Sequence, residues 1–236
     1  MQNRYAGDIG DFSKFILLKK VFGDKKIGLN WYLYPDESHT NDGVHTNYNY
    51  ENDFGISKIL NTISCNHDKR NVDTLEKEMK KIFKDIEYFS ELIEKEDECE
   101  KDRVSYRQNW FNKSIKKFKD KDVIFVDPDN GIEVSSISTK GRKKAGKYIF
   151  YDEIKQILAL ENVETLVIYQ HYKREKNFKQ KIVNEIKEKL SDELNNKNLY
   201  AVSFHKLSAR VYIIVSKKDL SKELETFANE NQDWRF

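Results

Sequence analysis

Three apolar runs along the chain predict strands of one sheet. Residues 123–126 are apolar without alternation, which is typical of a strand buried on both faces of a parallel sheet. Residues 165–169 show the same pattern, and residues 27–34 are rich in β-forming side chains. Because proline cannot continue a central ladder, Asp127, which precedes Pro128, is expected at the carboxyl end of the central strand.

Helical spacing of apolar residues predicts the helices that cover this sheet. They are expected at residues 12–22, where Asp11 is the N-cap, and at 106–119, 152–160, 178–194 and 219–229. Residues 199–204 and 210–215 are two further strands, and the connection between them is so short that only an antiparallel hairpin can make it. The pattern therefore predicts an α/β fold: a doubly wound, mostly parallel sheet with a C-terminal antiparallel hairpin.

Residues 54–120 are expected to form a mainly helical insertion. Leu75, Met79 and the apolar residues that follow keep helical spacing for several turns. Residues 86–92 have an alternative as a short strand, since Tyr88 and Phe89 suit a sheet. With only 2 prolines, 9 glycines and no internal repeat, residues 1–236 are expected to be a single domain.

Composition narrows the class of protein. No apolar run approaches the roughly 20 residues of a membrane-spanning helix, and the first residues lack the apolar core of a signal peptide. Cys65 and Cys99 have no metal-ligand spacing, so we expect reduced thiols in a cytoplasmic protein. Charged residues make up 35% of the chain but the net charge is only +2, so a nucleic-acid partner would need a local basic patch. The oligomeric state stays open.

The candidate site lies where the predicted strands end. Open α/β sheets bind their ligands beyond the carboxyl ends of the strands. If the first and central strands are neighbours, one crevice brings together Asp127, Pro128, Asp129, Asn130, Asp36, Glu37 and His39, with Gln170 and His171 beside them. For His171 the alternative is a structural histidine whose hydrogen bonds are satisfied.

A local basic patch follows the same crevice in the sequence. The loop 140–147 contains Arg142, Lys143 and Lys144, and Lys173 and Arg174 come after the strand 165–169. As a phosphate-contacting patch these side chains would bind nucleic acid; the alternative is an ordinary solvated loop.

Two motifs resemble known enzymes. The order of strands and helices after residue 121 resembles the second half of the class I S-adenosylmethionine-dependent methyltransferases, in which the final strand is inserted antiparallel. Asp127-Pro128-Asp129-Asn130 resembles the Asp/Asn-Pro-Pro-aromatic motif of amino-methyltransferases, where the acidic or amide side chain accepts hydrogen bonds from the target amine. The likeness is loose and covers roughly residues 5–37 and 121–215.

The N-terminal segment adds to this resemblance. Gly-Asp-Ile-Gly-Asp-Phe-Ser-Lys-Phe is similar to a segment of the adenine-N6 methyltransferases of large-subunit ribosomal RNA, in which a lysine approaches the cofactor; Lys14 is the matching residue. Two features depart from the family pattern. The loop after the first strand has no glycine-rich turn, and Asp129 and Asn130 replace the second proline and the aromatic residue.

The resemblance implies methyl transfer from S-adenosylmethionine to a nucleic-acid amine. Asp127 would orient the amine, while Lys14, Asp36, Glu37 and His39 would hold the cofactor. By residue type alone, Lys14 is instead expected to be a surface lysine that snorkels to solvent.

Two other functions remain open on the same residues. In the first, Asp127, Asp129 and Asp36 bind Mg²⁺ or Mn²⁺ and the protein is a metal-dependent phosphoesterase or nuclease. In the second, the fold is a non-catalytic module that binds a nucleotide or a protein.

Overall fold

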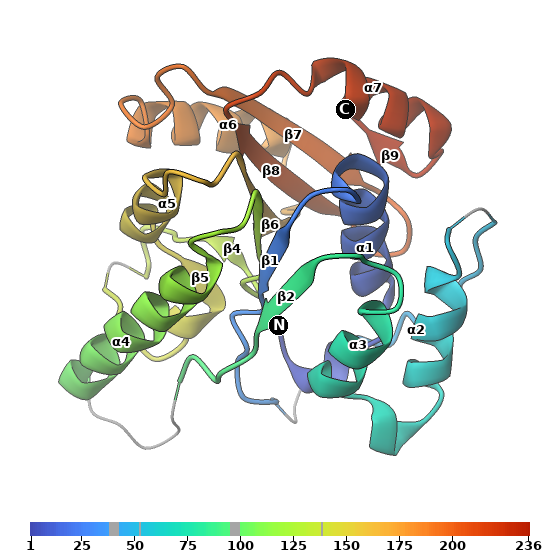
Figure 1. The fold of residues 1–236 in the computed structure, drawn as a ribbon. Helices are drawn as coiled ribbons and strands as arrows, with labels where there is room; N and C mark the ends of the chain where they lie inside the picture. Colours follow the sequence, from blue (N-terminus) through green and yellow to red (C-terminus); the bar gives the residue numbers. More distant parts are fainter. Residues whose placement is uncertain (38–42, 52, 95–99, 138) are drawn as a thin grey trace.

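A mixed sheet runs through the molecule. The structure is a computed structural model that describes residues 1–37, 43–51, 53–94, 100–137 and 139–236. Within these residues the sheet has seven strands in the order β2-β1-β3-β6-β8-β7-β9 (Figure 1). Its strands are β1 (Ile27–Asn30), β2 (Ile86–Phe89), β3 (Val123–Val126), β6 (Thr165–His171), β7 (Asn198–Phe204), β8 (Arg210–Ser216) and β9 (Trp234–Arg235). A separate pair, β4 (Gly131–Ile132) and β5 (Tyr148–Ile149), is parallel.

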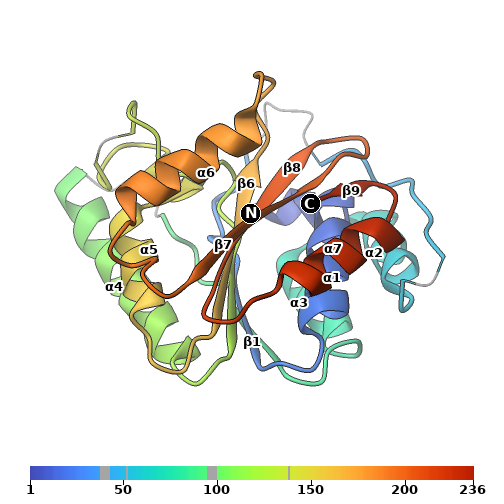
Figure 2. The same cartoon turned by 90° about the horizontal axis from the view of Figure 1, so that it is seen from above.

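Helices cover both faces of this sheet, so the fold has three layers (Figure 2). One face carries α1 (Ile9–Phe22), α2 (Ile56–Ser64), α3 (Val72–Met79) and α7 (Ser221–Glu230); the other carries α4 (Glu100–Phe118), α5 (Tyr151–Leu158) and α6 (Phe178–Lys189). Successive β3 side chains alternate between the two cores: Val123 and Phe125 pack on the α1 side, Ile124 and Val126 on the α4 side. A strand covered on both faces needs apolar residues throughout, which explains the unbroken run.

The strand directions confirm the predicted fold class. β1, β2, β3 and β6 are parallel, and β8 lies antiparallel between β6 and β7. This is an α/β, methyltransferase-like fold with a C-terminal hairpin. From β1 the chain continues to β2 on one side, and then returns to β3 on the other. β1 and β3 therefore flank a topological switch point, where open sheets bind ligands.

Two predicted boundaries near this switch point are wrong. The cap of α1 is Asp8, whose side chain accepts hydrogen bonds from the backbone of Gly10 and Asp11; Asp11 is instead buried within the helix. β1 ends at Asn30, although the β-forming run continues. The Asn30 side chain accepts a hydrogen bond from the Tyr32 backbone, and Tyr32 has a φ of 46°, a conformation that breaks the ladder.

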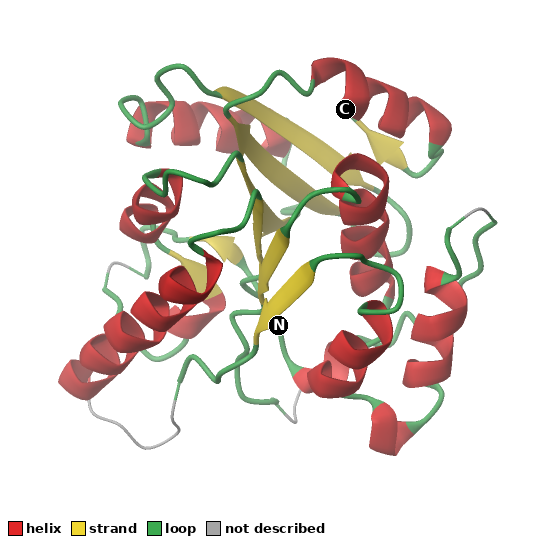
Figure 3. Cartoon of the chain, in the orientation of Figure 1, coloured by secondary structure: helices red, strands yellow, loops and turns green. Residues whose placement is uncertain are grey.

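The segment 54–120 contains more than helices. It holds α2, α3 and α4, but also β2, which pairs with β1 in the main sheet (Figure 3). The strand alternative for residues 86–92 is therefore correct for Ile86–Phe89, and the predicted helical run ends at Met79. The segment accordingly supplies one strand of the sheet in addition to its helices.

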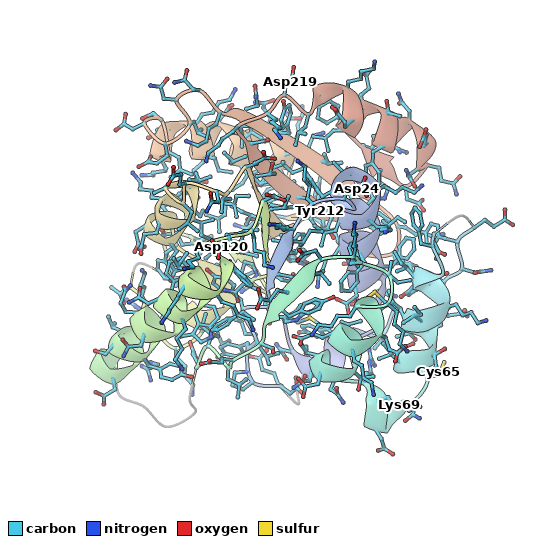
Figure 4. All side chains as sticks on the ribbon, in the orientation of Figure 1. Asp24, Cys65, Lys69, Asp120, Tyr212 and Asp219 are labelled. Atoms are coloured by element: carbon cyan, nitrogen blue, oxygen red, sulfur yellow. The ribbon has the colours of Figure 1, made fainter. Side chains whose placement is uncertain are left out.

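Further from the sheet, α6 ends at Lys189, before the predicted end at Leu194. In the described part of the chain, no helix is both long and apolar enough to cross a membrane. Cys65 is exposed at the periphery of the molecule (Figure 4), while Cys99 lies outside the described residues.

Candidate functional site

A cavity of about 480 Å³ lies at the carboxyl ends of β3 and β6, on the α1 side of the sheet. Its size falls within the roughly 300–1,000 Å³ that is usual for small-molecule sites. Side chains from α1, β6, β8 and the loops after β1 and β3 line it. The predicted site residues among them are Lys14, Glu37, Asp127, Asp129, Asn130, Lys144 and His171.

Asp127 and Lys14 form a buried ion pair in this cavity. Asp127 continues the side of β3 on which Val123 and Phe125 lie, so its carboxylate meets α1. The Lys14 Nζ atom lies 2.6 Å from Asp127 Oδ2 and 2.9 Å from Asp11 Oδ1. Lys14 is buried, so it is not the snorkelling surface residue that its type suggests.

Burial and charge oppose each other in this cluster. Burial raises the pKa of the Asp127 carboxyl, and the nearby Lys14 charge offsets this only in part. Burial alone would lower the pKa of Lys14, but Asp11 and Asp127 hold it well above its ordinary value. The second Asp127 oxygen, Oδ1, accepts no hydrogen bond from the described residues and belongs to a side chain that lines the cavity.

Asp129 lies in a second cluster of charges at the cavity wall. The Met1 amino nitrogen is 2.5 Å from Asp129 Oδ1, and Gln2 donates to Oδ2 at 2.8 Å. Lys147 is 3.8 Å from the same carboxylate and pairs with Glu37. Although burial opposes it, these donors hold the pKa of Asp129 below its usual value.

Gln170 shapes the loop that carries Asp129 and Asn130. Its side chain accepts from the Ile132 backbone at 2.9 Å and donates to the Asn130 carbonyl at 3.2 Å. Gly131 has a φ of 95°, and a Cβ added there would lie 2.3 Å from Gln170 Oε1. Glycine is therefore required for both backbone conformation and space.

Another part of the cavity lining comes from β6 and β8. Their antiparallel register sets His171 opposite Arg210, and Tyr169 opposite Tyr212. Tyr169, His171 and Arg210 line the cavity. Because β8 is antiparallel to β6, its first residue lies at the carboxyl edge of the parallel strands.

The carboxyl end of β1, where the resemblance places the cofactor, is filled by protein. Trp31 and Tyr32 are fully buried there, and the Trp31 backbone donates to the Phe89 carbonyl at 3.1 Å. The Tyr34 backbone donates to the Met1 carbonyl at 2.8 Å. No residue of β1 or β2 lines the cavity. Without a glycine-rich turn, the residues present at this strand end do not fit S-adenosylmethionine.

Several predicted site residues lie away from the cavity lining. Pro128 is buried and its carbonyl accepts from Gly131. Asp36 is exposed and accepts from the Arg4 backbone, and His39 lies outside the described residues. Of the predicted basic patch, four residues are exposed and do not line the cavity: Arg142, Lys143, Lys173 and Arg174.

The proposed metal ligands are not brought together. Asp127 pairs with Lys14 and Asp129 with the Met1 amine, whereas Asp36 is not part of the cavity. Among the described residues, no three His, Cys, Asp or Glu side chains are grouped so that they could hold a metal ion.

Sequence analysis missed Arg210 and Tyr169, although a signal for both was present. Tyr169 ends the predicted strand 165–169, and Arg210 begins the predicted strand 210–215. An antiparallel last strand starts where its parallel neighbour ends, so the hairpin prediction already placed both residues at the ligand-binding edge.

Comparison with known proteins adds little to this geometry. The sequence matches no protein-family model and resembles no curated protein. Among solved structures, the chain is similar to a methyltransferase from Pyrococcus furiosus, with 12% identity and a TM-score of 0.34 over 62% of this chain and 70% of that one. So distant a likeness says nothing about activity, and the fold class is defined by the strand order and directions.

Proposed function

We propose that this protein binds an adenine nucleotide in the cavity and recognises the exocyclic amino group of the base through Asp127. The observation that carries the proposal is the Asp127 carboxylate, which is held by Lys14 through Oδ2 and has Oδ1 free of hydrogen bonds from the described residues. A fixed acceptor of this kind suits an N–H donor on a base. Lys14 gives the acceptor its orientation.

Asn130 supports the choice of adenine. It lines the cavity beside Asp127, and its side-chain amide makes no hydrogen bond to the described residues. An asparagine amide both donates and accepts, which matches the adjacent amino group and ring nitrogen of adenine. Tyr5 also lines the cavity, and the Arg4 guanidinium lies 4.9 Å from its ring centroid.

Calorimetric titration with adenosine and with inosine tests the proposal. Inosine has a carbonyl where adenosine has the amino group, so the wild-type protein should prefer adenosine by about tenfold or more, the value of one charge-assisted hydrogen bond. Equal affinities would contradict amine recognition.

Asp127→Asn makes the test sharper because it should change the preference from adenosine to inosine. Lys14 donates to whichever side-chain oxygen is present, so the new amide would direct its NH₂ group into the cavity and favour the inosine carbonyl. Asp36→Asn is the matched control, since Asp36 is exposed and does not line the cavity. A reversal confined to Asp127→Asn is the expected result.

Methyl transfer to the bound amine is a second candidate. It is favoured by the Asp127-Pro128 pair at the carboxyl end of β3 and by the antiparallel hairpin strand. It ranks second because the carboxyl end of β1 does not fit the cofactor. Calorimetry on metal-free protein with millimolar S-adenosylmethionine separates the two: measurable binding would favour a methyltransferase, and its absence would favour a binding function.

A further inference from the structure

The cavity lining includes a buried arginine from β8 that forms no ion pair with a described carboxylate. Arg210 is only 3% exposed. Its guanidinium donates to the Ser208 carbonyl through Nε at 3.2 Å and to Ser13 Oγ through Nη1 at 3.4 Å. Within the described residues no Asp or Glu forms an ion pair with it. Burying a guanidinium without an anion is costly, and its remaining N–H groups are available to a ligand.

The nearest carboxylates are engaged elsewhere. Asp8 caps α1 by accepting from the Gly10 and Asp11 backbones, and Asp11 accepts from Lys14 and from the Gly7 backbone. Burial opposes the charge of Arg210, but the surrounding tyrosines with Asp8 and Asp11 keep its pKa raised. The guanidinium therefore stays charged while its own donors remain largely unused.

Two other donors line the same cavity. The Tyr169 hydroxyl makes no hydrogen bond to any described residue, and burial raises the pKa of Tyr169 to about 12, so it remains protonated at neutral pH. Lys144 is exposed at the rim of the cavity and has no ion pair in the described chain. The cavity thus contains two donors, the Arg210 guanidinium and the Tyr169 hydroxyl, beside the carboxylates of Asp8, Asp127 and Asp129.

We propose that Arg210 and Tyr169 form an anion subsite that binds the phosphate of the ligand. A guanidinium presents N–H groups in a planar fork that matches phosphate oxygens, and a neutral phenol adds a further donor. The anion subsite extends the proposed function and rests on it only for the identity of the base. The ligand class becomes a phosphorylated adenosine, with the phosphate carried either by a mononucleotide or by a nucleic-acid diester.

Four ligands, each titrated calorimetrically, distinguish phosphate binding from amine recognition: AMP, IMP, adenosine and inosine. The ratio of AMP to adenosine affinity reports the phosphate, and the ratio of AMP to IMP reports the amine. Arg210→Gln should reduce the first ratio by about 10- to 100-fold, since charge-assisted hydrogen bonds are lost, and leave the second unchanged. An unaltered AMP-to-adenosine ratio in Arg210→Gln would overturn the subsite.

Tyr169→Phe guards against a folding defect in Arg210→Gln, because it removes only a hydroxyl that has no partner in the described residues. It should reduce the AMP-to-adenosine ratio by about fivefold, and no change in that ratio would remove Tyr169 from the subsite. Circular dichroism on each variant checks the fold.

If no nucleoside or nucleotide binds, the proposed function fails. The subsite can then be tested by itself with inorganic pyrophosphate, whose binding is observed by phosphorus NMR. Line broadening that is lost in Arg210→Gln would sustain it, and no broadening in the wild type would overturn it.

A short oligoadenylate without terminal phosphates distinguishes the two sources of phosphate. Binding at least as tight as that of AMP, and weakened by Arg210→Gln, would assign the subsite to a nucleic-acid diester. Weaker binding than AMP would assign it to the phosphate of a mononucleotide.

Discussion

Lys14 on the second turn of α1 and Asp127 after β3 are joined by a 2.6 Å ion pair, and both residues line the cavity. Both side chains are almost fully buried, and Asp11 adds a second carboxylate to the same ammonium. One lysine thus compensates two buried acids. The pair links a helix to the strand beside the topological switch point, so it serves both the stability of the fold and the orientation of Asp127.

Lys14→Met should destabilise the protein strongly because it leaves two carboxyls buried without a cation. Removing one partner of a buried pair costs about 3–5 kcal/mol in the free energy of unfolding. Urea denaturation at pH 7 measures the loss. Lys58→Met, at an exposed position of α2, is the matched control and should change little.

The pH dependence of Lys14→Met gives an independent check. Burial already raises the pKa values of Asp11 and Asp127, and without Lys14 they should rise further. The folded variant then binds protons more readily than the unfolded chain, so its free energy of unfolding should increase as the pH falls from 7 towards the ordinary aspartate range. A variant that loses stability over that interval would contradict the assigned charges.

The sequence predicted the position of Asp127 but not its environment. An unbroken apolar run followed by proline specifies a buried strand and its end, since these depend on local chemistry alone. The burial of Lys14 could not be predicted in this way. It depends on two carboxylates, one of them 113 residues away, meeting the same ammonium.

The region after β1 was harder to predict for the same reason. Its residues suit a strand, yet Tyr32 adopts a left-handed conformation that is held by the Asn30 side chain, and the Tyr34 backbone bonds to Met1. Tertiary contacts override the local preference here. For this reason the sequence pattern predicts Asp36 in the crevice, whereas it lies outside the cavity lining.

Gly131→Ala should destabilise the loop that carries Asp129 and Asn130 by more than the backbone strain alone would. The substitution forces alanine into a φ of 95° and sets its Cβ against the Gln170 amide. We expect a loss of about 2–4 kcal/mol, of which about 1–2 comes from the left-handed backbone and the rest from the clash. Urea denaturation measures the loss, and weaker adenosine binding should accompany it.

Gly55→Ala is the control that separates these two effects. Gly55 has a similar φ of 80°, but a Cβ there would meet nothing within 4 Å. It should therefore show only the backbone cost. Equal losses in the two variants would mean that Gln170 moves aside freely and does not fix the loop.

Glu153→Gln tests the buried ion pair behind the cavity, where Arg107 Nε lies 2.7 Å from Glu153 Oε1. Although burial opposes it, Arg107 holds the pKa of Glu153 below its ordinary value of 4.5, so the carboxylate stabilises the fold at neutral pH. The variant should lose about 3–5 kcal/mol in the free energy of unfolding at pH 7 because it leaves Arg107 buried without a counter-charge.

The stability that the Glu153 charge contributes is fully present above pH 4.5 and is lost as the pH falls through the lower pKa of the folded state. The difference in unfolding free energy between the variant and the wild type should therefore narrow only below pH 4.5. Urea denaturation from pH 7 to pH 3, with the exposed Glu225→Gln as control, measures it. A gap that is constant down to pH 3 would show that the stability comes from the packing of Glu153 and not from its charge.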